Sequence, residues 1–477
     1  MGAIHGWETY SIRILRSQKL KASLLIIILM TLRTIRQDVL RKIKPDLQEE
    51  RRTEEFVLKL MEACNELNME AELCGSLGKK TWLKGDHDVD MFLLFPPSLS
   101  RKDLELKGMG AAKEIARKIQ GVPVVKYAEH PYLRIRADGF AVDCVPCYKI
   151  ASCDKIISAV DRSPLHTRYV MHRLAPGFRD EVRLLKQFCK GAGVYGSDVG
   201  HHGISGYACE LLVIAYGKFE TVLREIGKWK PQVIIDVEHI GKIKFGEPLA
   251  IVDPVDPERN VTANMNAENV IKLVEATKKF LYNPSAEAFF PTQTVLDTEK
   301  KIRMKSRGTK FFAMKMKKPD VIEDTLLPQL KKAASRIASI LGENDFSIIR
   351  DFSFADESHM YIIYELNVWK QPAIKKMDGP LVFAKKHAGE FVKKYTAGYF
   401  PPYVDGEQWH AEKRREFNEA RALLASLKAR KDLPAMGIPS HMAEPFRKGE
   451  LLEDEDFWKD VLRNKALSSF LNEKYFG

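Results

Sequence analysis

The chain has 477 residues, which is longer than a single hydrophobic core supports, so we expect two to four domains. Hydrophobic residues make up 45% and charged residues 29% of the chain, a balance that excludes extensive disorder. The formal net charge of +12 favours an acidic partner such as nucleic acid or an anionic membrane, although surplus lysine is also a common means of solubility.

The N-terminus carries an apolar run, residues 24–30, behind several basic residues. The run is far shorter than the ~20 residues that span a bilayer, and no small-residue cleavage site follows it. We therefore expect no membrane span. Residues 1–29 are interpreted as an appended or mis-started leader, with Met30 as the natural beginning of the protein.

Secondary structure in the following segment alternates between helices and strands. Residues 31–67 have helical spacing with a break at Pro45, and a strand-like stretch then reaches Leu73 and Cys74. A second strand is expected over Val89–Phe95, and a helix over residues 100–120. This alternation predicts an α/β domain.

A hairpin is predicted next, because Asp138-Gly139 is the two-residue sequence that best fits a type I′ turn. It joins the strands Tyr132–Ala137 and Phe140–Val145. Counting outward from the turn pairs Arg134 with Asp143, on the polar face of the hairpin.

The remainder of the chain divides into two sections. Residues 168–228 have helical patterns with glycine breaks, and the turn-rich segment Val252–Asn260 precedes another helix. The basic run Lys300–Lys318 opens a section with both strand and helix patterns, including an apolar strand over Met360–Val368.

Seven cysteines all lie in the N-terminal half, which is typical of reduced thiols in a cytoplasmic protein. Cys144 and Cys147 are spaced as in a redox motif or half of a zinc site, but no second pair follows at ligand spacing. We expect structural cysteines.

The strongest chemical signal is Gly75-Ser76 followed by Asp88 and Asp90 at the start of an apolar strand. Residues i and i+2 of a strand point to one face, so the two carboxylates project together and suit a divalent cation. Nucleotidyl transfer needs this arrangement, and the Gly-Ser pair would cradle a phosphate. Asp143, a charge in an otherwise apolar strand, would complete the set. The plainer alternatives are a solvated acidic strand end and, for Asp143, a salt bridge with Arg134.

The segment Gly75–Asp90 resembles the signature of the nucleotidyltransferase superfamily, in the form found in class I, archaeal-type CCA-adding enzymes. Further stretches extend the resemblance from about Met30 almost to the end of the chain: residues 127–132, 142–148, 158–164, 181–186, 203–207 and 252–260. This resemblance implies an α+β multidomain protein with a palm-like nucleotidyltransferase head, built from a mixed sheet with helices, a helical neck, an α/β body and a tail. The implied ranges are a head over 30–168, a neck over 169–290, a body over 291–395, a tail over 396–450 and a C-terminal helix over 451–477 that returns to the body.

The resemblance also implies the site residues. Asp88, Asp90 and Asp143 would be catalytic and bind metal, with Asp143 nearest the attacking 3′-hydroxyl. The incoming CTP or ATP would be held by the following residues: Gly75, Ser76, Lys79, His166, Lys186 and Tyr195, with His130 and Ser163 as weaker candidates. Lys79 stands where related sequences often have arginine. Relatives also tend to carry a base-reading arginine before the strand Val233–Val237, where this chain has Lys230-Pro231-Gln232.

The implied activity is the template-independent addition and repair of the 3′-terminal CCA of tRNA, from CTP and ATP, by two-metal nucleotidyl transfer with Mg²⁺ in the cytoplasm. A homodimer is compatible with the sequence. Two rivals remain open: a poly(A)- or oligoadenylate-type polymerase of the same superfamily, and a non-catalytic RNA-binding relative.

The basic run Lys300–Lys318 is the candidate RNA-binding segment. Such a run is usually a solvated face, but Phe311 and Phe312 interleave with it, which favours contact with RNA phosphates. The basic residues that we expect to bind RNA are Arg303, Lys305, Arg307 and Lys310.

Overall fold

The structure, a computed structural model of the chain, describes residues 30–127, 131–152, 156–197, 201–230, 232–241, 246–292, 294–321, 323–398 and 400–476. Contacts within the chain divide it into two units, Met1–Thr292 and Gln293–Gly477. The expectations for residues 1–29, His130 and Pro231 lie outside the described residues.

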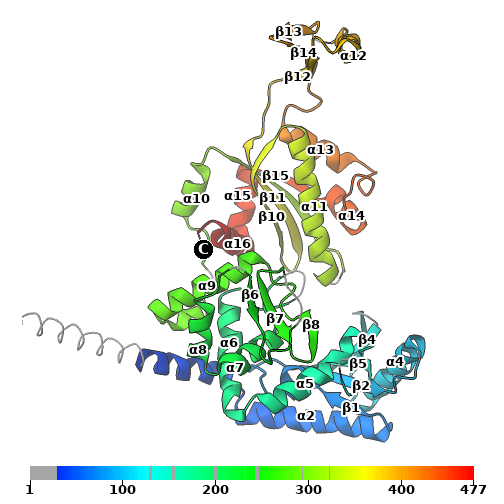
Figure 1. Ribbon diagram of the computed structural model, residues 1–477, viewed down its shortest axis with the longest axis vertical. Helices are drawn as coiled ribbons and strands as arrows, with labels where there is room; N and C mark the ends of the chain where they lie inside the picture. Colours follow the sequence, from blue (N-terminus) through cyan, green and yellow to red (C-terminus); the bar gives the residue numbers. More distant parts are fainter. Residues whose placement is uncertain are drawn as a thin grey trace, which may run out of the picture. The chain divides into compact units, whose positions relative to one another are not determined.

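A five-stranded mixed sheet is the centre of the first part of unit 1 (Figure 1). Its order is β1-β2-β5-β4-β3; β2 and β5 are parallel and the other neighbours antiparallel. The strands are β1 (Ala71–Leu73), β2 (Asp88–Phe95), β3 (Val122–Tyr127), β4 (Pro131–Ala137) and β5 (Phe140–Tyr148). The edge strand β3 was not predicted; its Pro123 is tolerated because an edge strand has one side without a partner.

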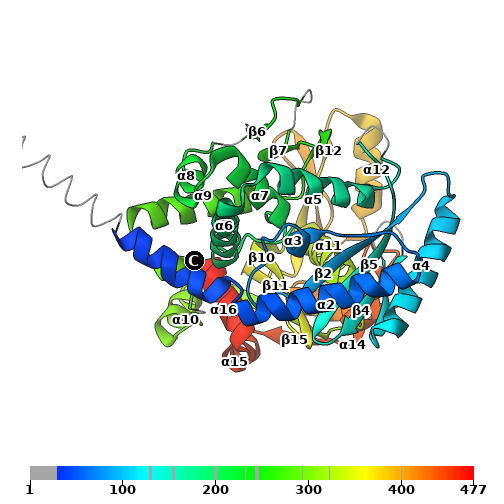
Figure 2. The same cartoon turned by 90° about the horizontal axis from the view of Figure 1, so that it is seen from below.

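The helices α2 (Leu47–Glu66) and α4 (Arg101–Lys118) pack side by side on one face of this sheet (Figure 2). A preceding helix over residues 30–43 ends just before Pro45, as predicted. Both flanking helices begin at a side-chain cap, Asp46 for α2 and Ser100 for α4. The short helix α3 (Gly75–Gly78) lies between β1 and β2.

Alternation along the strands builds the core under these helices. Val89, Met91 and Leu93 of β2 and Val142 and Cys144 of β5 are fully buried and pack in one cluster with side chains of α2 and α4. Because strand side chains alternate between faces, the residues between them project to the other side of the sheet. The acidic residues of β2 and β5 are therefore kept out of this core.

The described cysteines are all unpaired and buried. Cys144 and Cys147 pack in separate apolar clusters on the two sides of β5, and burial raises the pKa of Cys64 to about 11. This burial among apolar side chains is what structural cysteines require, and the expectation for Cys153 lies outside the described residues.

The second part of unit 1 is mainly helical, around a core in which the rings of Phe188, Phe219, Phe280 and Phe289 meet edge to face or tilted. Its helices are η2 (Ala159–Asp161), α5 (Arg162–Arg173), η3 (Pro176–Phe178), α6 (Arg179–Gly191), α7 (Gly206–Tyr216), α8 (Phe219–Ile226), α9 (Ala267–Tyr282) and η4 (Ala286–Ala288). A small sheet of order β6-β7-β8 accompanies them, with β6 (Val233–Ile235), β7 (Leu249–Asp253) and β8 (Asp256–Asn260). The turn-rich segment is thus a hairpin of β7 and β8.

Unit 2 has a four-stranded antiparallel sheet of order β10-β11-β9-β15. Its strands are β9 (Lys310–Lys317), β10 (Ser347–Ala355), β11 (His359–Val368) and β15 (Glu450–Glu453). The helices of this unit that pack with it are α10 (Thr298–Lys305), α11 (Glu323–Glu343), α13 (Ala420–Ala429), α14 (Ser440–Lys448), α15 (Glu455–Arg463) and α16 (Lys465–Phe476). One core contains side chains of α11, α13 and α14, and a second core contains those of α15 and α16.

A separate small sheet of order β12-β14-β13 belongs to unit 2 and contacts α12 (Lys385–Tyr395). Its strands are β12 (Ile374–Leu381), β13 (Tyr403–Asp405) and β14 (Gln408–Arg414). The boundary expected at residue 396 falls inside this module, and α13 and α14, which we expected in the tail, contribute to the core of the main sheet instead. The C-terminal segment, expected as one helix over 451–477, begins with most of β15 and continues as the two helices α15 and α16.

No helix among the described residues is long and apolar enough to cross a membrane.

Candidate active site

Two acidic residues lie side by side on the neighbouring parallel strands β2 and β5. Asp90 lies opposite Asp143 in the register, and Asp88 lies opposite Ala141. Asp88 is exposed, and Asp90 and Asp143 are half-buried, whereas their strand neighbours Val89 and Val142 are fully buried. The structure therefore brings the three predicted acidic residues to one face of the sheet.

Asp90 also lies directly against Gly75, whose backbone has a φ of +64°. A Cβ atom placed on Gly75 would lie 1.7 Å from Oδ2 of Asp90, so no larger residue fits between α3 and the carboxylate. Ser76 follows and is half-buried. The glycine thus lets the Gly-Ser segment approach the acidic strand closely.

The electrostatics of the acidic residues fit a divalent cation. Burial, followed by the charge of Asp143, raises the pKa of Asp90 to about 6. The pKa of Asp88 is also raised, first by partial desolvation of its carboxyl group and then by the charge of Asp86, although the residue as a whole is exposed. Crowded carboxylates of this kind are relieved by a bound cation, and their oxygens are the ligands that Mg²⁺ prefers. Within the described part of the chain, no three acidic, histidine or cysteine side chains already converge on a metal position.

Asp143 is instead turned toward Arg134 of β4. Nε and Nη2 of Arg134 donate to Oδ1 and Oδ2 of Asp143, each at 2.6 Å. The two residues are direct partners in the antiparallel register, and the turn residues Asp138 and Gly139 have φ values of 51° and 84°, as a type I′ turn requires. The predicted register is confirmed, and so is the ion pair that the sequence left as the alternative for Asp143.

The two lysines predicted to hold the nucleotide meet at one buried carboxylate, Glu210 of α7. Nζ of Lys79 lies 2.6 Å from Oε2 of Glu210, and Nζ of Lys186 lies 3.1 Å from Oε1. The side chains of Lys79 and Lys186 are 7% and 3% exposed, and that of Glu210 is fully buried. Sequence reasoning missed Glu210, although a single charge in the apolar helix α7 signals a buried partner.

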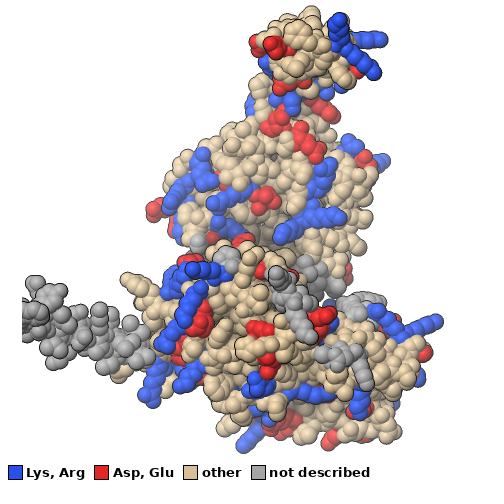
Figure 3. Space-filling model, in the orientation of Figure 1, with Lys and Arg blue, Asp and Glu red and all other residues tan. Residues whose placement is uncertain are grey.

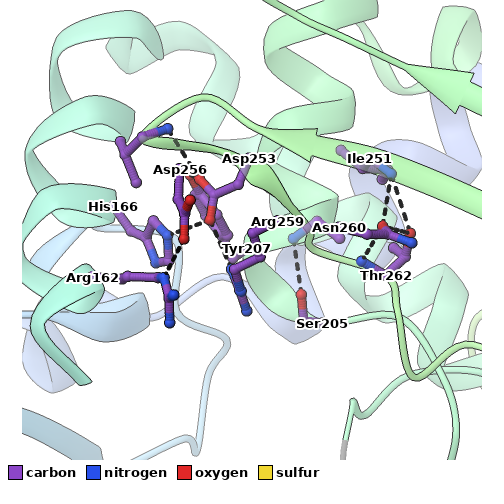
Figure 4. A network of polar contacts seen from close by, with 12 residues as sticks. Arg162, His166, Ser205, Tyr207, Ile251, Asp253, Asp256, Arg259, Asn260 and Thr262 are labelled. Atoms are coloured by element: carbon purple, nitrogen blue, oxygen red, sulfur yellow. Dashed lines mark hydrogen bonds and ion pairs between the residues drawn. The ribbon is translucent and has the colours of Figure 1, made fainter. Parts of the chain in front are cut away.

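His166 belongs to a second buried network, drawn in Figure 4. Its Nε2 lies 2.8 Å from Oδ2 of Asp253, and its ring stacks on Tyr207 at 4.0 Å between centroids. The hydroxyl of Tyr207 and the guanidinium of Arg259 also donate to Asp253, at 3.0 and 2.7 Å. Burial lowers the pKa of His166, with the hydrogen bond to Asp253 opposing it. Asp253 and Arg259 were not predicted as site residues.

Ser163 and His166 line one cavity of about 750 Å³, together with Tyr207 and Arg259. Tyr195 is half-buried and lies near Lys186. A Cβ atom added to Gly206 would lie 3.0 Å from the Tyr195 hydroxyl and 3.2 Å from Cε of Lys186. Apart from Gly75 and Ser76, which lie beside Asp90, the described residues predicted to bind the nucleotide form two groups, one around Glu210 and one around Asp253. Tyr207 contacts both groups, because Nζ of Lys79 lies 5.2 Å from the centre of its ring and its hydroxyl donates to Asp253.

In unit 2, three of the four predicted RNA-binding residues are paired with carboxylates. Lys305 contacts Glu455, Arg307 contacts Glu365, and Lys310 contacts Glu453. Arg303 is exposed, with its guanidinium 5.7 Å from the ring centre of Phe476.

The aromatic part of this prediction is wrong. Phe311 and Phe312 are each only 1% exposed, and they pack in the two opposite cores of the sheet. Adjacent strand residues alternate between faces, so a sheet with a core on each side buries both rings. They are therefore not available to RNA.

Three family models match the chain. They are described as "Nucleotidyltransferase domain" over residues 57–166, "tRNA nucleotidyltransferase, second domain" over residues 180–290, and "CCA-adding enzyme, C-terminal domain" over residues 307–454. Together they span both units.

Similar proteins named CCA-adding enzyme occur in several archaea. The protein of Methanosarcina barkeri is 42% identical over 357 residues, which cover 74% of this chain and 78% of that protein. The protein of Methanothermobacter thermautotrophicus is 37% identical over 429 residues, which cover 87% of this chain and 93% of that protein.

Solved structures give more distant matches. The Cid1 poly(U) polymerase with Mg 3′-dATP bound aligns with a TM-score of 0.42 and 15% identity, covering 53% of this chain and 94% of that one. The E. coli MS115-1 CdnC with ATP aligns with a TM-score of 0.41 and 18% identity, covering 54% and 94%.

Proposed function

The chain belongs to the CCA-adding enzymes, and from this premise we propose that it adds and repairs the 3′-terminal CCA of tRNA, using CTP and ATP without a nucleic-acid template. The observation that carries the proposal is the row formed by Asp90 and Asp143 beside Gly75. We further propose that the catalytic head covers residues 30–168, that the neck covers residues 169–290, and that unit 2 binds RNA.

Asp88, Asp90 and Asp143 are the proposed ligands of the catalytic metal, which we propose to be Mg²⁺. The raised pKa values of Asp88 and Asp90 support this, since crowded carboxylates favour a bound cation. A bound divalent cation lowers the pKa of the attacking 3′-hydroxyl and neutralises charge on the triphosphate. The chain's own contribution is to place the carboxylates on adjacent parallel strands, with Asp143 on the strand nearer Arg134.

The incoming nucleotide is proposed to lie along the two buried networks. Gly75, Ser76 and Lys79 would face the triphosphate, because the glycine admits close backbone approach and Lys79 is a cation beside it. Ser163 and His166 line the 750 Å³ cavity, which is large enough for a nucleoside. Lys186 and Tyr195 belong to the group around Glu210: Lys186 binds this carboxylate, and Tyr195 lies near Lys186.

Unit 2 is proposed to contact the phosphates of the tRNA. Lys and Arg side chains gather over α10 on the face drawn in Figure 3. Arg303 is exposed there, and Lys305 and Arg307 are each 37% exposed although paired. Lys310, 24% exposed, is the more enclosed candidate. Contacts of this kind recognise the shape and charge of A-form RNA.

One assay tests the activity. The protein is incubated with CTP, ATP, Mg²⁺ and tRNAs that end before, within and after the CCA sequence. We expect each incomplete tRNA to be extended to CCA and the complete tRNA to be left unchanged. Long adenylate products would indicate the poly(A)-type rival, and no extension with retained tRNA binding would indicate a non-catalytic relative.

A further inference from the structure

Glu210 is a fully buried carboxylate in the apolar helix α7 (Gly206–Tyr216). Taking a carboxylate out of water is costly unless cations and hydrogen bonds surround it. Burial raises the pKa of Glu210, but the charges of Lys79 and Lys186 outweigh this effect and hold the pKa at about 2. The side chain is therefore ionised in the folded protein.

Three side chains from two other segments bind this carboxylate. Lys79 and Thr81, which follow α3, contact it at 2.6 and 2.5 Å, and Lys186 of α6 contacts it at 3.1 Å. Glu210 thus joins the segment that follows the Gly-Ser pair to two helices of the neck.

The two lysines use their protons differently. Nζ of Lys186 lies 3.2 Å from the carbonyl of Thr81 and 2.9 Å from its hydroxyl, in addition to Glu210. These three contacts account for all three protons of its ammonium group. For Lys79 the described residues show one hydrogen bond, to Glu210, and a face-on contact with the ring of Tyr207. Lys79 therefore keeps protons for a further anion.

The same neck helix fixes the backbone from which Lys79 extends. Arg183 of α6 donates to the carbonyls of Lys80 and Trp82, both at 2.9 Å, and Lys186 donates to the carbonyl between them. Three consecutive carbonyls are thus held by two cations one helical turn apart. The position of Lys79 depends on α6 and on Glu210 rather than on its own segment alone.

Removal of the negative charge would disturb this arrangement. Burial already lowers the pKa of Lys186, and the neighbouring charge of Lys79 lowers it further, with Glu210 as the opposing charge. Without Glu210 two ammonium groups would face each other in a buried space, so one would lose its proton or move into solvent.

We propose that Glu210 is a positioning residue that holds Lys79 charged and in place for the triphosphate of the incoming nucleotide, with Lys186 as the second cation of the buried cluster. The proposal rests on the proposed function, in which these lysines belong to the nucleotide site. Glu210 itself does not contact the nucleotide. Its effect should be confined to ligands that carry the β- and γ-phosphates, because Lys79 is proposed to act on these groups.

The test compares binding of CTP and CMP to the full-length chain by calorimetry in the presence of Mg²⁺. Glu210→Gln, which keeps the shape and removes the charge, should raise the Kd for CTP by about tenfold and that for CMP by less than about twofold. Glu210→Asp, which keeps the charge but shortens the side chain, should give an intermediate Kd for CTP and serves if the Gln variant does not fold.

The matched control is Glu181→Gln in α6. Glu181 is also a buried carboxylate, but it binds Arg36 and the backbone N–H of Phe219 instead of the lysines. Its removal should lower the Tm and leave both Kd values unchanged.

Two outcomes would overturn the proposal: equal losses of CTP and CMP affinity in Glu210→Gln, or tighter binding of CTP, which would mean that Glu210 competes with phosphate. Lys79→Met and Lys186→Met separate this failure from that of the proposed function. If both leave CTP binding unchanged, the lysines do not belong to the nucleotide site at all.

Discussion

Arg134 and Asp143 form a bidentate ion pair across the hairpin of β4 and β5, in which two guanidinium nitrogens of Arg134 each donate to one carboxylate oxygen of Asp143 at 2.6 Å. The same carboxylate is a proposed metal ligand. The arginine and a metal ion would therefore compete for the same oxygens, and the hydrogen bonds to Asp143 raise the pKa of Arg134, which keeps the arginine charged.

The first prediction concerns this competition. Arg134→Met should tighten Mn²⁺ or Mg²⁺ binding by roughly three- to tenfold, because the variant frees both oxygens of Asp143. The Tm should fall in metal-free buffer, since the carboxylates then repel one another unopposed, and saturating Mg²⁺ should restore it. Calorimetric metal titration and thermal unfolding with and without Mg²⁺ measure the two effects. An unchanged metal affinity would show that the pair is only structural.

The second prediction concerns Asp90. Asp90→Asn keeps the shape of the side chain and removes the charge that the proposed metal needs, so nucleotide addition should fall by about a thousandfold or more. The affinity for tRNA should stay within about twofold, because this carboxylate faces α3 rather than a basic surface. Single-turnover extension and filter binding provide the two readouts. Turnover near the wild-type rate would end the assignment of Asp90 as a metal ligand.

The third prediction uses Gly75, whose added Cβ would collide with the carboxylate of Asp90 and whose φ is +64°. Gly75→Ala should therefore lower both the Tm and the activity. The loss of activity should exceed what the loss of folded protein accounts for, because the added methyl group displaces the Asp90 carboxylate. Gly110→Ala in α4 is the control: nothing lies within 4 Å of the position that its methyl group would take, and alanine favours a helix by roughly 0.5–1 kcal/mol. Thermal melts should show a lower Tm for Gly75→Ala and an equal or higher Tm for Gly110→Ala, and only Gly75→Ala should slow extension.

The fourth prediction is a pH dependence from Glu210. Its folded-state pKa is about 2 and its ordinary value is 4.5, so the unfolded chain binds the proton first as the pH falls. The stability that this residue contributes is present above about pH 4.5 and is lost as the pH falls toward 2. Glu210→Gln should be less stable than wild type at pH 7, and the difference in urea midpoint should shrink at pH 3. A constant difference between pH 7 and pH 3 would contradict this assignment of the charge.

Features governed by nearest neighbours could be predicted from the sequence. Asp88 and Asp90 lie on one face of the sheet because side chains repeat every two residues along a strand. The pairing of Arg134 with Asp143 follows from the turn residues between them. The break at Pro45 is equally local, because proline lacks the N–H that a helix interior requires. Membership of the family could also be predicted, since its motifs are short stretches of sequence.

Only the tertiary structure decided which charges from distant segments of the chain meet. Glu210 lies 131 residues from Lys79, and Asp253 lies 87 residues from His166, so no periodicity within one element relates them. The burial of Phe311 and Phe312 likewise depends on there being a core on both sides of their sheet, which the pattern of β9 alone does not reveal. Turn conformation and strand alternation depend on a few neighbouring residues, so they can be predicted from the sequence. Partners for buried charges are set by which distant elements pack together.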